Sequence, residues 1–189
     1  MPINITIQLN SAEDNPCLIL EKDKLISCSN YEPISWILGA ENLGIALSHL
    51  SKNSCFRIIK LANPDFTKLP RFLSPKDNVL GYATIQKVFT SLDAEIRHLS
   101  NPSTADYYSL AGEIEDHANN TIYVVEKLKR IVDNMSYIFA IELMHTAQAI
   151  DLRTDWILGE GTKKAYEEIR KVLPFYSEDR PIYKDIKTM

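Results

Sequence analysis

The sequence predicts an all-α fold, a bundle of long helices with one short β-hairpin near the N-terminus. The first indication is the stretch 112–150, which contains no proline and would be roughly 58 Å long as one helix at about 1.5 Å per residue. The second is the amphipathic spacing of apolar residues over 81–100. The third is a pair of short apolar runs within 17–28, which a polar stretch separates as in a hairpin.

The long helix carries a continuous seam of mostly apolar residues that recur at alternating spacings of three and four, as in a packed helix of a bundle. Its second half, 137–150, is apolar on nearly every face, and a helix that is apolar all round is buried all round. We therefore expect this half to contact other subunits or parts of the same protein outside this chain. The seam consists of Ala118, Thr121, Val125, Leu128, Val132, Met135, Phe139 and Glu142.

The remaining elements follow from caps, turns and breakers. Residues 1–10 have no cap or linker before them, so they are either a short N-terminal strand or an element that a truncated chain or a split gene interrupts. We also expect helices over 29–51, 56–61 and 162–172, a connecting loop over 65–78 and an extended tail after 173.

Composition limits the classes of protein that fit. With 189 residues, 45% of them hydrophobic, the chain suits a single helical domain over 1–189. A net charge of −4 without a basic cluster argues against a nucleic-acid surface, and no apolar run is long enough for a membrane span. Three widely spaced cysteines favour neither a disulfide framework nor a zinc site, so we expect a cytoplasmic protein.

An acidic cluster, Glu113, Glu115, Asp116 and His117, lies at the predicted start of the long helix. Neighbouring carboxylates shift one another's pKa and suit acid–base catalysis. Alternatively, carboxylates in a first helical turn are favoured by the helix dipole, and Glu115 would complete a capping box if Gly112 were the N-cap. Both interpretations remain open from the residues alone.

Glu142 and His145 have the ExxH spacing that supplies half of a di-iron site in a helical bundle. Such a site also requires two further glutamate ligands from other helices, which no spacing in this sequence identifies. We therefore predict no metal site, and expect the two side chains to hydrogen-bond to each other or to neighbouring helices.

Several segments, in their order and spacing, closely resemble the C-terminal part of aromatic amino acid ammonia-lyases, with histidine ammonia-lyase nearest. The resemblance covers essentially the whole chain. The segments are EDNP (13–16), ISCSNY (26–31), ENLGIALSHLS (41–51), LPRFL (69–73), LGYATIQ (80–86), EDH (115–117), AIEL with AQAIDLR (140–153) and the closing GTKKAYEEIRKVLPFYSEDRPIYKDI.

That resemblance implies non-oxidative elimination of ammonia from an aromatic amino acid, such as histidine to urocanate. The family uses a methylidene-imidazolone group formed from an internal Ala-Ser-Gly, which this sequence lacks. The chain would then be the C-terminal third of such an enzyme and inactive by itself. Its expected partners are the N-terminal part, an aromatic amino acid substrate and further copies of the protein, because family active sites form where subunits of a homotetramer meet.

Three positions carry over from the family. Glu115 matches the pocket glutamate of the family's QEDH segment and is the expected catalytic residue. Tyr31 matches the pocket aromatic of SGGNF, and Ala83 falls at a substrate-lining position that is commonly larger. Departures from the family pattern, Ile114 for Gln and SCSNY for SGGNF among them, indicate a divergent substrate or relaxed function.

Two alternatives accompany the lyase interpretation. A 2,3-aminomutase of the same family shares the scaffold and can also carry Glu at the Glu115 position. A non-catalytic helical remnant, which oligomerises but forms no electrophile, is the alternative from another class.

Overall fold

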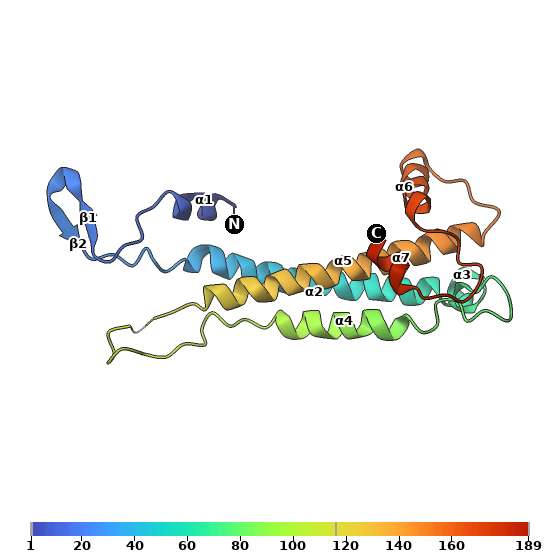
Figure 1. Cartoon of the computed structure of the whole chain (residues 1–189), viewed down its shortest axis with the longest axis horizontal. Helices are drawn as coiled ribbons and strands as arrows, with labels where there is room; N and C mark the ends of the chain where they lie inside the picture. Colours follow the sequence, from blue (N-terminus) through green and yellow to red (C-terminus); the bar gives the residue numbers. More distant parts are fainter. Residues whose placement is uncertain (1, 116, 189) are drawn as a thin grey trace. The chain divides into compact units, whose positions relative to one another are not determined.

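The computed structural model describes residues 2–115 and 117–188 and confirms the predicted fold class: within them the chain is helical apart from one hairpin and connecting loops (Figure 1). No helix in this described part has an apolar segment sufficient to cross a bilayer. The elements are α1 (Pro2–Leu9), β1 (Cys17–Ile19), η1 (Leu20–Lys22), β2 (Lys24–Ile26), α2 (Ile34–Leu61), α3 (Pro64–Thr67), η2 (Arg71–Leu73), α4 (Gln86–Leu99), α5 (Thr121–Asp151), α6 (Glu160–Val172) and α7 (Tyr183–Thr188).

The described residues form two compact units. One consists of the residues up to 46 together with 97–131, and the other of 47–96 together with the residues from 132 onward. Both α2 and α5 contribute a part of their length to each unit. The prediction of one domain over 1–189 therefore stays a prediction.

The predicted hairpin is confirmed. Strands β1 and β2 pair antiparallel, with Cys17 opposite Ile26 and Ile19 opposite Lys24. Residues 2–9 form the helix α1, so the alternative of a short N-terminal strand is wrong. The β-branched residues of this segment favour a strand by propensity, which is a weak guide when contacts elsewhere decide.

Helix α2 runs without interruption where the sequence predicted one helix to about 51 and another over 56–61. The polar residues between them were interpreted as a break, but two of their hydroxyls are fully buried and bonded to neighbouring helices. Ser51 donates to Asp93 of α4 at 2.8 Å, and Ser54 donates to Glu142 of α5. Tertiary hydrogen bonds thus compensate for the weak helix propensity of serine.

Helix α4 begins five residues later than predicted because the chain turns sharply at Gly81. This glycine has φ +60°, and a Cβ there would lie 2.6 Å from the carbonyl oxygen of Phe72. The next residue, Tyr82, donates its backbone N–H to the same carbonyl at 2.9 Å. Only glycine suits so close an approach with a positive φ.

Helix α5 begins at Thr121, so the predicted start at residue 112 and the capping box of Gly112 with Glu115 are both wrong. Asn120 precedes the helix with φ 50°, a conformation that asparagine tolerates. Its side-chain amide donates to the carbonyls of Ser103 and Asp106 at 2.8 and 2.7 Å. Residues 110–115 therefore lie in a loop before the helix, where the dipole of α5 does not explain their charge.

The predicted seam along α5 is right at Met135, which is buried, and at Leu128, which packs against the core, but is wrong at its valines. Val124, Ile131 and Ile138 are buried, whereas Val125 and Val132 are 43% and 47% exposed. The helix presents two adjacent apolar lines, and periodicity alone does not tell which of them faces the other helices.

The chain itself covers most of the segment 137–150. Ile138, Ile141 and Met144 are fully buried, and Tyr137 and Leu143 are 43% and 42% exposed. The expectation that burial of this segment requires other subunits is therefore wrong for most of its length.

The loop and the tail are more ordered than predicted. The loop predicted over 65–78 contains most of α3 and all of η2, and the tail contains α7. A buried amide, Gln148, explains the order of the tail, since it accepts from the backbone N–H of Tyr176 and donates to the carbonyl of the same residue, both at 3.1 Å. Tyr176 and Leu173 are buried in consequence.

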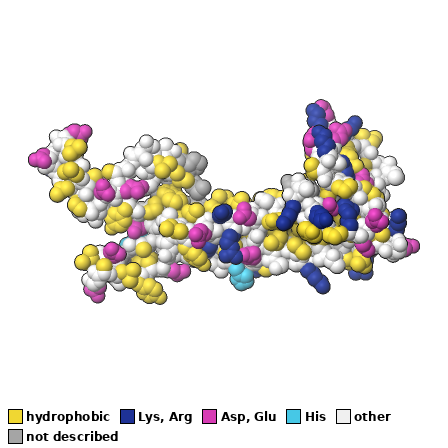
Figure 2. Space-filling view, viewed as in Figure 1, with side chains coloured by type: hydrophobic (Ala, Val, Ile, Leu, Met, Phe, Trp, Pro, Cys, Tyr) yellow, Lys and Arg dark blue, Asp and Glu magenta, His cyan; other side chains and the backbone are white. Residues whose placement is uncertain are grey.

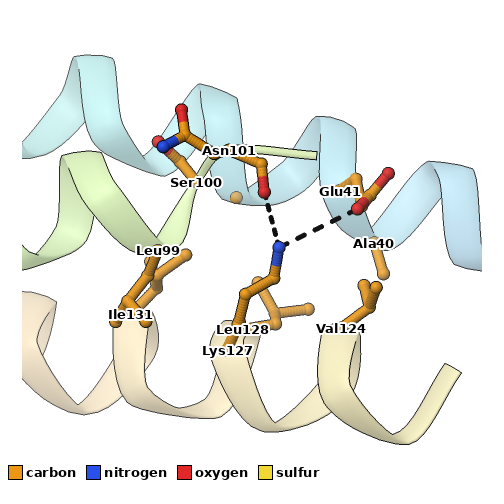
Figure 3. Close-up of a pocket in the computed structure, with 10 residues that line it drawn as sticks. Ala40, Glu41, Leu99, Ser100, Asn101, Val124, Lys127, Leu128 and Ile131 are labelled. Atoms are coloured by element: carbon orange, nitrogen blue, oxygen red, sulfur yellow. Dashed lines mark hydrogen bonds and ion pairs between the residues drawn. The ribbon is translucent and has the colours of Figure 1, made fainter. Parts of the chain in front are cut away.

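In the first unit, a buried carboxylate joins α2 to the loop that follows α4. Glu41, 7% exposed, accepts the backbone N–H groups of Ser103 and Thr104 and the Thr104 hydroxyl. Lys127 of α5 lies 3.9 Å from the same carboxylate and donates to the carbonyl of Asn101 at 2.5 Å (Figure 3). Beside this cluster Ile37, Ala40 and Val124 form an apolar core.

Replacing Glu41 by Ala should lower the free energy of unfolding by about 3 kcal/mol, because it leaves the buried Lys127 charge and two backbone N–H groups without their acceptor. Urea denaturation followed by circular dichroism measures the loss. The control is Glu126→Ala at an exposed site of α5, which should change stability by less than about 0.5 kcal/mol. Equal denaturation midpoints for the two variants would show that the Glu41 cluster does not contribute to stability.

Candidate functional site

Tyr31 lies in a tight turn before α2. The backbone N–H of Glu32 donates to the carbonyl of Ser29 at 3.0 Å, which closes the turn. Gln8 donates to the carbonyl of Asn30, and the Asn30 amide donates to the carbonyl of Ala12 at 2.8 Å. The turn is thus fixed on both sides, and the Tyr31 ring remains half exposed.

Glu115 lies at the end of a short closed loop. Leu110 and Glu115 exchange two backbone hydrogen bonds, of 2.8 and 3.2 Å. Between them Ala111, Gly112 and Glu113 all have positive φ, which turns the chain back on itself. The Glu115 side chain is exposed. Asp116 of the acidic cluster lies outside the described residues.

The carboxylate of Glu32 links these two segments. His117 Nδ1 lies 3.4 Å from Glu32 Oε2, and the amide of Asn119 donates to the same oxygen. The Tyr107 ring lies against the His117 ring, with centroids 4.8 Å apart. The structure therefore brings together the segments that carry Tyr31 and Glu115, although they lie far apart in the sequence.

Exposed apolar side chains lie on these segments among polar and acidic ones (Figure 2). Tyr108, Leu110 and Ile114 are 82%, 59% and 83% exposed on the loop, and Leu20 of η1 is 82% exposed. Exposed apolar side chains of this size suit contact with a partner. In this setting a carboxylate such as Glu115 can accept a hydrogen bond or a proton from a bound ring N–H, and Tyr31 can pack against an aromatic ring.

Ala83 belongs to the other unit. It is partly buried on the wall of a surface hollow of about 360 Å³, which Phe72, Lys76 and Leu80 also line. Leu80 is held by Asp179, both of whose carboxylate oxygens accept its backbone N–H at 3.1 Å. The pocket role of Ala83 stays a prediction.

Glu142 and His145 do not bond to each other. Glu142 accepts from Ser54 and forms a bidentate pair with Arg57, whose Nη2 lies 2.9 Å from Oε2. His145 is fully buried, donates from Nδ1 to the carbonyl of Ile141 at 2.8 Å and packs against Tyr82. Nowhere in the described part of the chain do three or more His, Cys, Asp or Glu residues gather as a metal site would require.

Glu32 and Asn119 are candidate site residues that the sequence did not predict. Glu32 follows Tyr31 directly, and Asn119 comes four residues after Glu115. Their contact spans 87 positions, so no local spacing reveals it. The only indication in the sequence was that the segments of Tyr31 and Glu115 both resemble pocket segments of the same family.

The family model of aromatic amino acid lyases matches residues 3–171. The chain belongs to this family. Histidine ammonia-lyase of Alkaliphilus oremlandii is 36% identical over 183 residues, which are 96% of this chain and 36% of that protein. The comparison confirms the resemblance to the C-terminal part of the lyases, and the chain spans about 36% of the length of the curated relatives it matches.

Two solved structures resemble this chain closely. The ergothioneine-degrading enzyme ergothionase of Treponema denticola is 54% identical, with a TM-score of 0.88 over 98% of this chain and 38% of that one. Tyrosine aminomutase of Streptomyces globisporus is 28% identical, with a TM-score of 0.89 over 98% of this chain and 36% of that one.

His145 should make the stability of the chain depend on pH between about 6.5 and 4. Burial lowers the pKa of the folded imidazole to about 4, against the smaller opposing effects of the Ile141 carbonyl and the Glu142 charge. Below pH 6.5 the unfolded chain therefore binds a proton that the folded chain does not, and stability falls as the pH falls. From pH 7 to 5 the loss should be about 2 kcal/mol.

Urea denaturation of the wild type and of His145→Phe at pH 7 and 5 measures this effect. The variant keeps an aromatic ring beside Tyr82 and removes the titrating group, so its loss between the two pH values should be smaller by about 2 kcal/mol. If the wild type and the variant lost the same free energy of unfolding between pH 7 and 5, His145 would not be the source of the pH dependence.

Proposed function

We propose that this chain forms the C-terminal part of an enzyme that eliminates an amine from an amino acid with an imidazole side chain. The observation that carries the proposal is the 54% identity to ergothionase, together with histidine ammonia-lyases among the curated relatives. The contact of the Tyr31 and Glu115 segments through Glu32 supports one shared pocket wall.

In this proposal Glu115 accepts a hydrogen bond from a ring N–H of the substrate, and Tyr31 packs against the ring. A carboxylate acceptor distinguishes an imidazole from a phenyl ring, which offers no N–H. The elimination breaks the Cα–N bond and removes a proton from Cβ, so that an arylacrylate and an amine leave.

The methylidene-imidazolone of this family would supply the electrophile that draws electrons from the substrate. This chain does not fit as its source, because no Ala-Ser-Gly triplet occurs in the sequence. We therefore propose that the N-terminal part of the same enzyme supplies it and that the chain alone is inactive. The exposed side chains of Ile114 and Leu20 suit contacts with that part.

Two imidazole substrates are the candidates. Histidine would yield urocanate and ammonia, as the names of the curated relatives suggest. Ergothioneine, a 2-thioimidazole whose α-nitrogen is trimethylated, would yield trimethylamine instead. The higher identity to ergothionase favours ergothioneine, and it agrees with the departures SCSNY and Ile114 from the usual pocket segments.

The proposed setting is a cytoplasmic homotetramer in which Tyr137 and Leu143, still exposed on α5, lie in subunit contacts. Free Cys17, Cys28 and Cys55 suit a reducing compartment. A 2,3-aminomutase remains the second catalytic candidate, which the likeness to tyrosine aminomutase favours. A non-catalytic oligomerising remnant is the outcome if no electrophile-bearing partner exists.

The test combines this chain with an N-terminal part that carries Ala-Ser-Gly, encoded in frame or in an adjacent gene. Ergothioneine, histidine and tyrosine are supplied in turn, and trimethylamine, ammonia and β-amino acid are measured. Trimethylamine from ergothioneine supports the favoured substrate, and a β-amino acid indicates an aminomutase. Absence of any product, or of any such N-terminal part, refutes the enzyme proposal.

Glu115→Gln in that complete enzyme should lower kcat/KM for the imidazole substrate about 100-fold, since an uncharged amide is a weaker acceptor for the ring N–H. The matched control is Glu113→Gln, an exposed glutamate in the same loop, which should change kcat/KM less than about threefold. Steady-state kinetics of both variants decide, and equal rates for Glu115→Gln and wild type would exclude the pocket role.

A further inference from the structure

We infer that Glu32 is a positioning residue, which sets the placement of Tyr31 relative to Glu115 by binding His117 and Asn119 at once. The inference rests on the proposed function, in which Tyr31 and Glu115 face one substrate. Glu32 itself need not touch the substrate, because its carboxylate is directed to the loop before α5.

The burial of Glu32 separates this contact from an ordinary surface ion pair. Its side chain is 17% exposed, and Asn119 is 6% exposed. Exposed ion pairs contribute little to fixed geometry, whereas a charge-assisted hydrogen bond to a buried amide is short and directional. The Asn119 contact is therefore the stronger of the two, and His117 adds a second point on the same oxygen.

Asn119 connects Glu32 to the first residue of α5. Its side-chain oxygen accepts the backbone N–H and the hydroxyl of Thr121, the first residue of the helix. Its amide thus holds Glu32 while its oxygen caps the helix, so the Tyr31 turn is fixed to the start of α5.

The loop that carries Glu115 is fixed from the other side as well. Asn120 holds the carbonyls of Ser103 and Asp106, and Glu41 holds the backbone N–H of Ser103. His117 stands two residues beyond Glu115, so its contact with Glu32 acts close to the predicted catalytic carboxylate. Small misplacements of such groups cost large factors in rate.

A double-mutant cycle in the complete enzyme tests the inference with the substrate that the wild type turns over. Glu32→Ala should lower kcat/KM roughly 30-fold when Glu115 is present. In the Glu115→Gln background, Glu32→Ala should lower kcat/KM less than about threefold, because the side chain that Glu32 positions no longer carries its charge. A full and equal loss in both backgrounds would overturn the inference, since a general loss of structure would act independently of Glu115.

Conservative variants separate positioning from folding. Glu32→Gln keeps an oxygen that accepts from Asn119, so it should recover most of the rate lost in Glu32→Ala. Thermal denaturation should give similar midpoints for the two Glu32 variants. A Glu32→Gln enzyme as slow as Glu32→Ala would contradict the role assigned to the Asn119 contact.

Hydrogen exchange of this chain tests the inference even if no substrate is found. The amides of Leu110 and Glu115, which close the loop, should exchange at least about tenfold faster in Glu32→Ala than in the wild type. The exposed control Glu126→Ala should leave them unchanged. Equal exchange in Glu32→Ala and wild type refutes the positioning role, whereas the proposed function would then still stand or fall on its own assay.

Discussion

The buried carboxylate of Glu41 determines where the candidate site can form. It accepts backbone N–H groups from the loop after α4, which would otherwise be buried without acceptors, and it lies beside the buried ammonium of Lys127. A loop held in this way does not continue α4, which ends at Leu99. Since Asn120 then binds the same loop, α5 begins at Thr121, and the residues before it are free to form the closed turn that ends in Glu115.

A second, largely buried carboxylate, Glu32, makes a similar arrangement in the same unit. Glu41 of α2 accepts backbone N–H groups of the loop after α4. Glu32, in the turn before α2, accepts the side-chain amide of Asn119 in the loop before α5. Glu115 and Tyr31, which match the family's pocket glutamate and pocket aromatic, therefore belong to the same compact unit. Two departures from the family's usual segments, Ile114 and the segment 27–31, fall on this unit.

The sequence was sufficient for features with local signals. The hairpin follows from two apolar runs around a polar turn, and the family follows from segments in a fixed order. The start of α5 could not be predicted from neighbouring residues. It depends on the contact of Asn120 with Ser103, and Ser103 is bound by Glu41, 62 positions away in the sequence. The continuity of α2 was missed for the same reason, as Ser51 and Ser54 look like breakers until their partners on α4 and α5 are known. Glu115 and Tyr31 came from the resemblance, and nothing local pointed to Glu32.

The central claim is that the Tyr31 turn and the Glu115 loop form one wall of a pocket for an imidazole amino acid. A crystal structure of the complete enzyme with a bound, unreactive substrate analogue tests it most directly. The account predicts a Glu115 oxygen within about 3 Å of a ring nitrogen and the Tyr31 ring in van der Waals contact with the imidazole. An analogue bound with both side chains more than about 6 Å from the ring, beyond any direct hydrogen bond, would contradict it.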